Sequence, residues 1–273
     1  MNLAFIGGGN MAYAMLGGMH DGGIPLAATH VLEPDAARGA ELARRYGVTT
    51  HGAAGDWLRS AQTIVLAVKP QQAHEAVDAA VRHLDAPLVL SIVAGVRGAT
   101  LARWFGHRRI VRAMPNTPAL IRAGITGAAA LPDVSAAQRA EAELILRSIG
   151  QVVWLDDEAM LDPVTAVSGS GPAYAFYFIE ALQQAALEMG FSAPQARALA
   201  VETFVGASLL AQQSGEAIGV LRERVTSKGG TTAAALGILE QERVRDSIVA
   251  AVRAARDRAA EMGEQFDVDG PSP

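Results

Sequence analysis

Hydrophobic residues in the first half of the chain gather in short, largely apolar runs that alternate with amphipathic segments. Helix-length segments such as Met11–Asp21 and Asp35–Tyr46 separate runs at Leu3–Ile6, His30–Glu33, Thr63–Val68, Leu88–Val93 and Ile110–Met114. Runs of this length and spacing are typical of parallel strands that are covered on both faces. The pattern therefore predicts an α/β fold that begins with a doubly wound parallel sheet.

The pattern changes after about residue 155. From Asp157 to Glu264 the chain contains Ala- and Leu-rich helical stretches without a convincing strand, and Pro194 stands where a helix is expected to begin. We predict two domains, residues 1–160 and residues 161–273, of which the second is entirely helical. The segment Gly270–Pro273 is expected to form a frayed tail.

Composition narrows the class of protein. The chain has 23 Lys and Arg against 28 Asp and Glu, a formal net charge of −5, which argues against a nucleic-acid partner. It has no cysteine, which excludes disulfides, thiolate catalysis and zinc–cysteine sites. It also lacks an apolar run of membrane-spanning length and the basic start of a signal peptide. We expect a cytoplasmic protein without a membrane partner.

A glycine-rich turn follows the first predicted strand. Gly7 to Ala12 matches the pattern G-x-G-x-x-A between a strand and a helix. In that pattern Gly7 permits the tight turn, Gly9 lets a pyrophosphate approach the backbone, and Ala12 lets the helix pack closely on the strand. The free N–H groups of the helix then face the anion. The pattern favours dinucleotide binding over the alternative, glycines that only form a turn.

Two charged residues bear on the choice of dinucleotide. Glu33, at the end of the second strand, is expected to accept a hydrogen bond from the adenosine ribose 2′-OH. Its carboxylate would repel a 2′-phosphate and so favour NADH over NADPH. Arg38, one helical turn further on, could oppose this by pairing with a 2′-phosphate. The alternative for both residues is a solvated surface charge.

Other candidate sites fail on spacing. A hydrolase nucleophile turn needs glycines two residues before and two after its serine, where Ser170 has Ser168 and Pro172. The six histidines show no metal-ligand spacing. The run Asp156–Glu158 is interpreted as charge in the first turn of a helix rather than as a metal corner. We therefore expect no metal site.

A second glycine-rich turn precedes an Ala-rich helix at Val225–Ala234. Its hydroxyls and glycines could present several N–H and O–H donors to one small anion. The alternative is an elaborate helix N-cap, although a cap needs only one such residue. A carboxylate suits the turn better than a phosphate, because Lys228 is the only nearby cation. Together with a dinucleotide domain, this predicts a reductase or dehydrogenase acting on a small acid.

Five motifs along the chain together resemble those of a known enzyme family. They stand in order at Phe5–Ala12, Ala67–Pro70, Arg112–Pro118, Val167–Tyr174 and Val225–Thr232. This set resembles the Δ1-pyrroline-5-carboxylate reductase family from residue 2 to about residue 265. The resemblance implies a Rossmann domain followed by a helical dimerisation domain, an active site near the dimer interface, and dimers that often assemble into a homodecamer. The implied reaction converts L-1-pyrroline-5-carboxylate and NADPH or NADH into L-proline, the last step of proline biosynthesis.

The resemblance also assigns residues. The implied pyrophosphate-binding residues are Ile6, Gly7, Gly8, Gly9, Asn10 and Met11. Ala67, Val68, Lys69 and Pro70 would line the cofactor cleft beside Glu33, and Asn116 and Thr117 would lie near the nicotinamide. The implied substrate-binding residues are Ser227, Gly229, Gly230, Thr231 and Thr232, with Thr232 and Ser227 as catalytic candidates.

Three positions depart from the family pattern. Glu33 stands where the family often has Ser or Arg, and Ala53–Ala54 where it often has an Asn that contacts the adenine ribose. Both departures put an NADPH preference in doubt. Lys228 stands where a Pro is common, and its charge could either help hold a carboxylate or be solvated.

Three other functions stay open. A β-hydroxyacid dehydrogenase would need a catalytic Lys on a helix of the second domain, but the only Lys beyond Lys69 is Lys228, in a turn. A non-catalytic dinucleotide sensor would leave the second glycine-rich turn without a purpose. A reductase for a related cyclic imino acid, such as the six-membered ring, stays open because the sequence pattern does not identify the pocket wall that would fix the ring size.

Self-association is expected from the helical half. The Ala-rich stretches Ala181–Leu187, Ala196–Leu210 and Ala250–Ala260 carry more apolar surface than one small helical domain can bury. The alternative is that alanine serves only helix propensity there.

Overall fold

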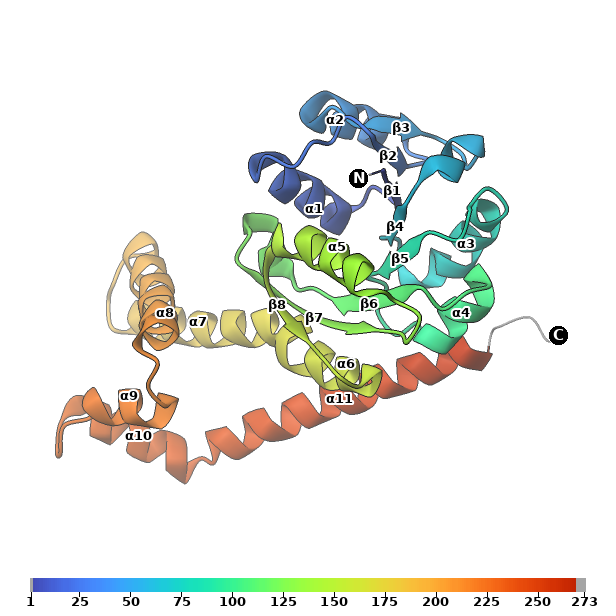
Figure 1. Cartoon of the computed structure of the whole chain (residues 1–273). Helices are drawn as coiled ribbons and strands as arrows, with labels where there is room; N and C mark the ends of the chain where they lie inside the picture. Colours follow the sequence, from blue (N-terminus) through green and yellow to red (C-terminus); the bar gives the residue numbers. More distant parts are fainter. Residues whose placement is uncertain (1, 269–273) are drawn as a thin grey trace. The chain divides into compact units, whose positions relative to one another are not determined.

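The structure, a computed structural model, describes residues 2–268 and contains one eight-stranded sheet (Figure 1). Its strand order is β3-β2-β1-β4-β5-β6-β7-β8. All neighbouring strands are parallel except β6 and β7, which are antiparallel. The strands are β1 (Leu3–Ile6), β2 (Thr29–Leu32), β3 (Thr49–His51), β4 (Thr63–Leu66), β5 (Leu88–Ser91), β6 (Ile110–Met114), β7 (Gly124–Ala130) and β8 (Gly150–Trp154).

Helices cover both faces of this sheet. Leu3 and Phe5 of β1 pack with buried residues of α1 (Asn10–Asp21), α2 (Ala36–Tyr46) and α5 (Ala136–Arg147). Ala4 and Ile6 face the other way, into a second core with α3 (Ala73–Val81) and α4 (Gly98–Phe105). Alternate residues of a strand point to opposite faces, so both faces must be apolar. The predicted doubly wound α/β arrangement is confirmed.

The rest of the chain is helical. The short α6 (Leu161–Val164) continues into a π-helical turn at Thr165–Gly169. It is followed by α7 (Gly171–Glu188), α8 (Ala193–Ser214), α9 (Ile218–Arg224), α10 (Thr231–Gln241) and α11 (Val244–Val268). Pro194 lies in the first turn of α8, after a capping box formed by Ser192 and Gln195. The prediction of a strand-free second half is confirmed for described residues 157–264.

The sequence prediction missed three strands. β3 has three partly exposed residues, and β7 consists mainly of Gly and Ala, which have weak β propensity. β8 is an edge strand in which exposed residues alternate with half-buried ones. The sheet is therefore mixed rather than wholly parallel. β4 and β5 also end two residues before the predicted ends at Val68 and Val93.

The chain divides into two compact units. One comprises residues 1–170 together with the chain from residue 255 onward, and the other comprises residues 171–254. The change at 170 lies ten residues after the predicted boundary at 160. A single boundary is also insufficient, because the end of α11 packs on the first unit, where Phe266 lies against the core formed with α3 and α4. The predicted frayed tail, Gly270–Pro273, lies outside the described residues.

Candidate active site

An open cleft lies at the point in the sheet where the chain reverses its direction of winding. Gly7 and Gly9, after β1, line one side, and Ala67 and Lys69, after β4, line the other. The cleft has a volume of about 610 Å³. β1 and β4 are parallel neighbours, while the chain leaves β1 toward β2 and returns from β3 to β4. Such a switch point at the carboxyl ends of parallel strands is where doubly wound folds bind ligands.

Gly7 and Gly9 of the first turn are required for different structural reasons. Gly7 has φ +99°, and a Cβ there would lie 2.7 Å from the Ala67 carbonyl oxygen. A Cβ on Gly9 would meet no heavy atom within 4 Å. Gly7 therefore permits the strand-to-helix turn, and Gly9 leaves the backbone open on the side of the cleft. Ala12 is fully buried against the sheet, as close packing requires.

The N-terminus of α1 fits a dinucleotide. Its N-cap is Gly9, no side chain caps its first-turn N–H groups, and its first turn holds no acidic residue. Uncapped N–H groups and the positive end of the helix dipole favour an anion, as the pyrophosphate of a dinucleotide would be. Asn10 and Met11 belong to this first turn, although neither lines the cleft.

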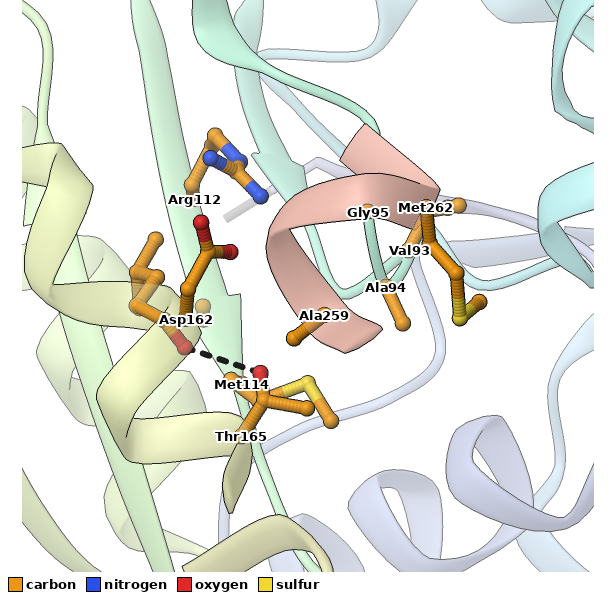
Figure 2. Close-up of a pocket in the computed structure, with 11 residues that line it drawn as sticks. Val93, Ala94, Gly95, Arg112, Met114, Asp162, Thr165, Ala259 and Met262 are labelled. Carbon is orange, nitrogen blue, oxygen red and sulfur yellow. Dashed lines mark hydrogen bonds between the residues drawn. The ribbon is translucent and has the colours of Figure 1, made fainter. Parts of the chain in front are cut away.

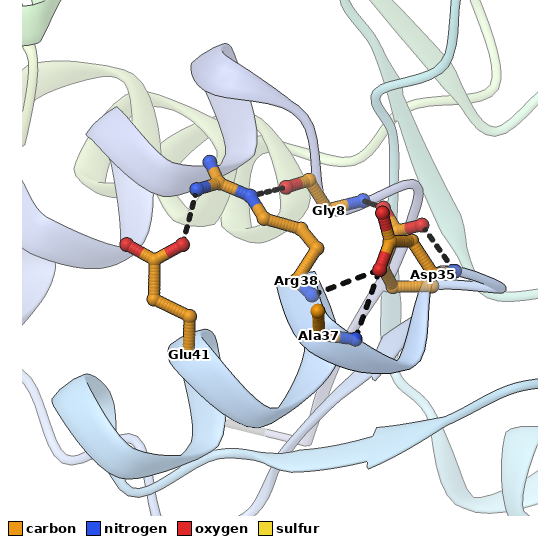
Figure 3. A network of polar contacts seen from close by, with 6 residues as sticks. Gly8, Asp35, Ala37, Arg38 and Glu41 are labelled. Carbon is orange, nitrogen blue, oxygen red and sulfur yellow. Dashed lines mark hydrogen bonds and ion pairs between the residues drawn. The ribbon is translucent and has the colours of Figure 1, made fainter.

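Glu33 and Arg38 are both held in a network around the glycine turn. Glu33 Oε2 accepts a hydrogen bond from the Gly8 N–H (3.0 Å), and Oε1 accepts one from the Asp35 N–H (2.9 Å). Arg38 donates from Nε to the Gly8 carbonyl (2.9 Å) and forms an ion pair with Glu41 (2.8 Å), as Figure 3 shows. The simple interpretation of two solvated surface charges is therefore wrong.

Small residues after β3 form the cleft wall beyond Glu33. Gly52, Ala53 and Ala54 line it, and the Trp57 indole N–H donates to the Ala53 carbonyl (3.3 Å). The Trp57 ring stacks on His51 with centroids 3.9 Å apart. Burial, with a smaller effect of charge on His30, lowers the pKa of His51.

Two residues that the resemblance assigns to the nicotinamide, Asn116 and Thr117, follow β6. Asn116 is buried, and its side chain bonds main-chain groups at both ends: Nδ2 donates to the Ser168 carbonyl (3.1 Å), and Oδ1 accepts from the Ile125 N–H (3.0 Å). This amide therefore joins the end of β6 to the π-helical turn and to β7. Thr117 begins a short 3-10 helix, Thr117–Ile121, and neither residue lines the cleft. Pro70, which starts the 3-10 helix Pro70–Gln72, does not line the cleft either.

A smaller pocket, with a cavity volume of about 30 Å³, lies beyond the ends of β5 and β6. Figure 2 shows Arg112 and Asp162 across it from Ala259 on α11. Arg112 is 7% exposed and forms an ion pair with Glu158 (2.5 Å), which also accepts from the Gly98 N–H (2.6 Å). Glu158 lies in the first turn of the 3-10 helix Glu158–Met160, as predicted, and Asp157 is the N-cap of that helix, but Glu158 also forms the ion pair with Arg112. Sequence reasoning missed it, because nothing local links positions 112 and 158.

The second glycine-rich turn lies in the second unit. Gly230 donates its N–H to the Ser227 carbonyl (3.0 Å), which closes a tight turn, and Gly229 adopts φ +73°. α10 then begins at Thr231 with Gly230 as its N-cap and no side-chain cap. The alternative interpretation of this turn as an elaborate Ser or Thr cap is therefore wrong. The Thr231 and Thr232 hydroxyls stand at the uncapped end of an 11-residue helix.

Comparison with known proteins agrees with this division of the chain. Residues 158–262 match the family description "pyrroline-5-carboxylate reductase dimerisation", and residues 2–95 match "NADP oxidoreductase coenzyme F420-dependent". The chain is 41% identical to the pyrroline-5-carboxylate reductase of Pseudomonas aeruginosa, with 97% of each chain covered. It is 38% identical to that of Haemophilus influenzae, with 97% of this chain and 98% of the relative covered.

Solved structures that this chain resembles include pyrroline-5-carboxylate reductases. A pyrroline-5-carboxylate reductase from Coxiella burnetii superimposes with a TM-score of 0.90 at 37% identity, covering 96% of this chain and 98% of the other. A Plasmodium falciparum pyrroline carboxylate reductase with NADP bound superimposes with a TM-score of 0.85 at 28% identity and the same coverage. Because likeness of this extent runs through both units, this chain belongs to the pyrroline-5-carboxylate reductase family, a family of oxidoreductases.

Proposed function

We propose that this chain reduces L-1-pyrroline-5-carboxylate to L-proline with NADPH or NADH. The full-length identity of 41% to a pyrroline-5-carboxylate reductase carries the proposal. The open cleft beside an uncapped helix N-terminus supports it independently, because an anionic dinucleotide needs both features.

The first unit would hold the cofactor. The main-chain N–H groups of Gly9, Asn10 and Met11 would bind the pyrophosphate, and Val68 and Lys69 would form the opposite wall. When bound, the reduced nicotinamide supplies the hydride for the imine carbon. Asn116 would fix the loop after β6, because both ends of its amide bond the main chain.

The second unit would hold the imino acid. The N–H groups of Gly229 and Thr231 and the hydroxyl of Ser227 would bind the ring carboxylate, while the Gly230 N–H is already used within the turn. The Thr232 hydroxyl would hydrogen-bond the ring nitrogen. A hydroxyl is a weak acid, so Thr232 would orient the ring more than it would protonate it.

The assembly belongs to the proposal as well. The match of residues 158–262 to a dimerisation family supports a homodimer, and we propose that dimers assemble further into a homodecamer in the cytoplasm. Among described residues, no helix is long and apolar enough to cross a membrane.

The test is the rate of NADH or NADPH oxidation by the purified protein with pyrroline-5-carboxylate. Turnover that yields proline is expected with either cofactor. Thr232→Ala should lower kcat/KM at least several-fold, because one hydrogen bond to a charged group contributes about 1.5–3 kcal/mol.

Thr203→Ala is the matched control for that variant. The Thr203 hydroxyl donates to the Leu199 carbonyl one turn earlier in its own helix, so its loss should leave kcat/KM unchanged. Wild-type kinetics in Thr232→Ala would remove Thr232 from the site. Cofactor binding without turnover would point to another imino acid, such as the six-membered ring, or to a sensor.

A further inference from the structure

The charges that line the cofactor cleft are mainly negative. Glu33, Asp35 and Glu75 contribute carboxylates, and among the described lining residues Lys69 is the single cation. A nicotinamide dinucleotide brings a pyrophosphate to such a cleft, and the phosphorylated form brings a further 2′-phosphate on the adenosine ribose. The cleft therefore faces two ligands that differ mainly in negative charge.

Glu33 stands where the charge of a 2′-phosphate would distinguish the two dinucleotides. It follows β2 directly, its carboxylate lies within hydrogen-bond distance of the Gly8 N–H, and a Cβ on Gly8 would lie 3.0 Å from Glu33 Oε2. Each carboxylate oxygen accepts a bond from one main-chain N–H, so the side chain is fixed rather than free to swing away. An acid at the end of the second strand of this fold meets the ribose 2′-OH.

Arg38 is the side chain that could neutralise a 2′-phosphate, and the fold holds it elsewhere. Its Nε bonds the Gly8 carbonyl, its terminal nitrogen pairs with Glu41 at 2.8 Å, and its guanidinium carbon lies 4.8 Å from the centre of the Tyr13 ring. These three contacts use the guanidinium's charge, one of its edges and one of its faces. Arg38 does not line the cleft.

We infer that this enzyme prefers NADH to NADPH, with Glu33 as the residue that rejects the 2′-phosphate and Arg38 kept from rescuing it by Glu41 and Tyr13. The inference rests on the proposed function, since it concerns the cofactor of that reaction. A phosphate monoester carries about −1.5 to −2 charges at neutral pH, so its approach to a fixed carboxylate is repulsive. A ribose hydroxyl would instead donate a hydrogen bond to the same oxygen.

The test is binding rather than turnover. Fluorescence titration of the intact protein with NADH and with NADPH gives two dissociation constants, and their ratio should favour NADH by about tenfold or more. Glu33→Gln keeps the shape of the side chain and removes its charge, so it should bring the ratio close to one. Glu33→Ser should reduce it further, because it also opens space beside Gly8.

Arg38 is tested in the variant that lacks the acid. Glu33→Ser with Glu41→Gln releases the guanidinium from its ion pair and should improve NADPH binding beyond Glu33→Ser alone. Adding Arg38→Ala should remove that gain. Glu75→Gln, which removes another carboxylate from the same cleft, is the matched control and should change both dissociation constants alike.

Each outcome of these titrations either supports or contradicts the inferred preference for NADH. Tighter binding of NADPH than of NADH by the wild-type protein, or an unchanged ratio in folded Glu33→Gln, would overturn the inference. Failure to bind either dinucleotide would overturn both it and the proposed function. Preferential NADH binding without reduction of pyrroline-5-carboxylate would leave the inference standing and defeat the proposed function alone.

Discussion

The two units of this chain differ in how completely they bury their own apolar side chains. The first unit has a closed core on each face of its sheet, with Phe5, Met15 and Leu66 fully buried. In the second unit α7, α9 and α10 have no buried residue, and α8 buries only Ala196 and Ala200. Large side chains there stay exposed, among them Phe176 (61%), Leu210 (55%) and Ile238 (60%).

The first unit therefore buries its apolar side chains within one chain, whereas the second leaves large apolar side chains exposed, as expected of a surface that associates. Large apolar side chains left exposed in such number are typical of an interface, and obligate dimer interfaces resemble a domain core cut in half. The match of residues 158–262 to a dimerisation family supports a second copy of the chain as the partner that covers this surface.

The largest expected effect is loss of the dimer when a charge is placed on the exposed apolar surface of the second unit. Leu210→Asp places a carboxylate on α8 where the apolar side chain is 55% exposed in the single chain. Burying that charge in a dimer would be costly, so the variant should be monomeric at micromolar concentration by light scattering.

Leu144→Asp on α5 is the matched control for association. Leu144 is similarly exposed, at 51%, but belongs to the first unit. It should leave the wild-type oligomer intact. A dimeric Leu210→Asp beside a monomeric Leu144→Asp would reverse the assignment of the interface.

The two glycine-rich turns also differ in how closely the rest of the chain packs around one of their glycines. Gly7 and Gly229 both have positive φ, but a Cβ on Gly7 meets the Ala67 carbonyl at 2.7 Å, whereas one on Gly229 meets nothing within 4 Å. Gly7→Ala combines backbone strain with a collision and should cost about 2–5 kcal/mol of unfolding free energy. Gly229→Ala carries only the strain and should cost about 1–2 kcal/mol.

Urea unfolding and cofactor titration distinguish the two variants. Gly7→Ala should also weaken NADH binding, because the displaced turn no longer presents the N-terminus of α1 to the pyrophosphate. Gly229→Ala should keep NADH affinity and raise KM for the imino acid. Equal losses of stability in both variants would contradict the view that only the first turn is packed within the chain.

The smallest expected effect is a pH response confined to the first unit, which holds all six histidines of the sequence. Burial lowers the pKa of His51, whose Nε2 lies 2.9 Å from Nδ1 of His30, and it also lowers the pKa of His107. When a pKa is lower in the folded state, the unfolded chain binds the proton first as the pH falls. The free energy of unfolding should therefore decrease below the ordinary histidine pKa of 6.5 and be fully restored above it.

His51→Gln removes one of these titrating groups. The decrease in the urea midpoint between about pH 7.5 and about pH 5.5 should be smaller than in the wild-type protein. The oligomeric state should not change over the same range. An unchanged decrease in the variant would show that the His30–His51 pair does not contribute to the pH response.

The site was predictable where its chemistry is local. The turn Gly7–Gly9, the uncapped helix after it and the hydroxyl-rich turn before α10 all follow from a few adjacent residues. Glu33 was identified as a residue facing the cofactor from its place at the end of a strand. What it bonds was not predictable, because Gly8 lies 25 positions away along the chain.

Tertiary structure decided the rest for the same physical reason. Side-chain spacing along one element fixes helix, strand and turn, and these are properties of the sequence by itself. The contacts of Arg38 with Gly8 and Tyr13, the bonds of Asn116 to two main-chain groups, and the packing of the end of α11 in the first unit depend on which elements pack together. Hydrogen bonds and ion pairs between distant segments form only after apolar burial has brought those segments together, so no local pattern encodes them.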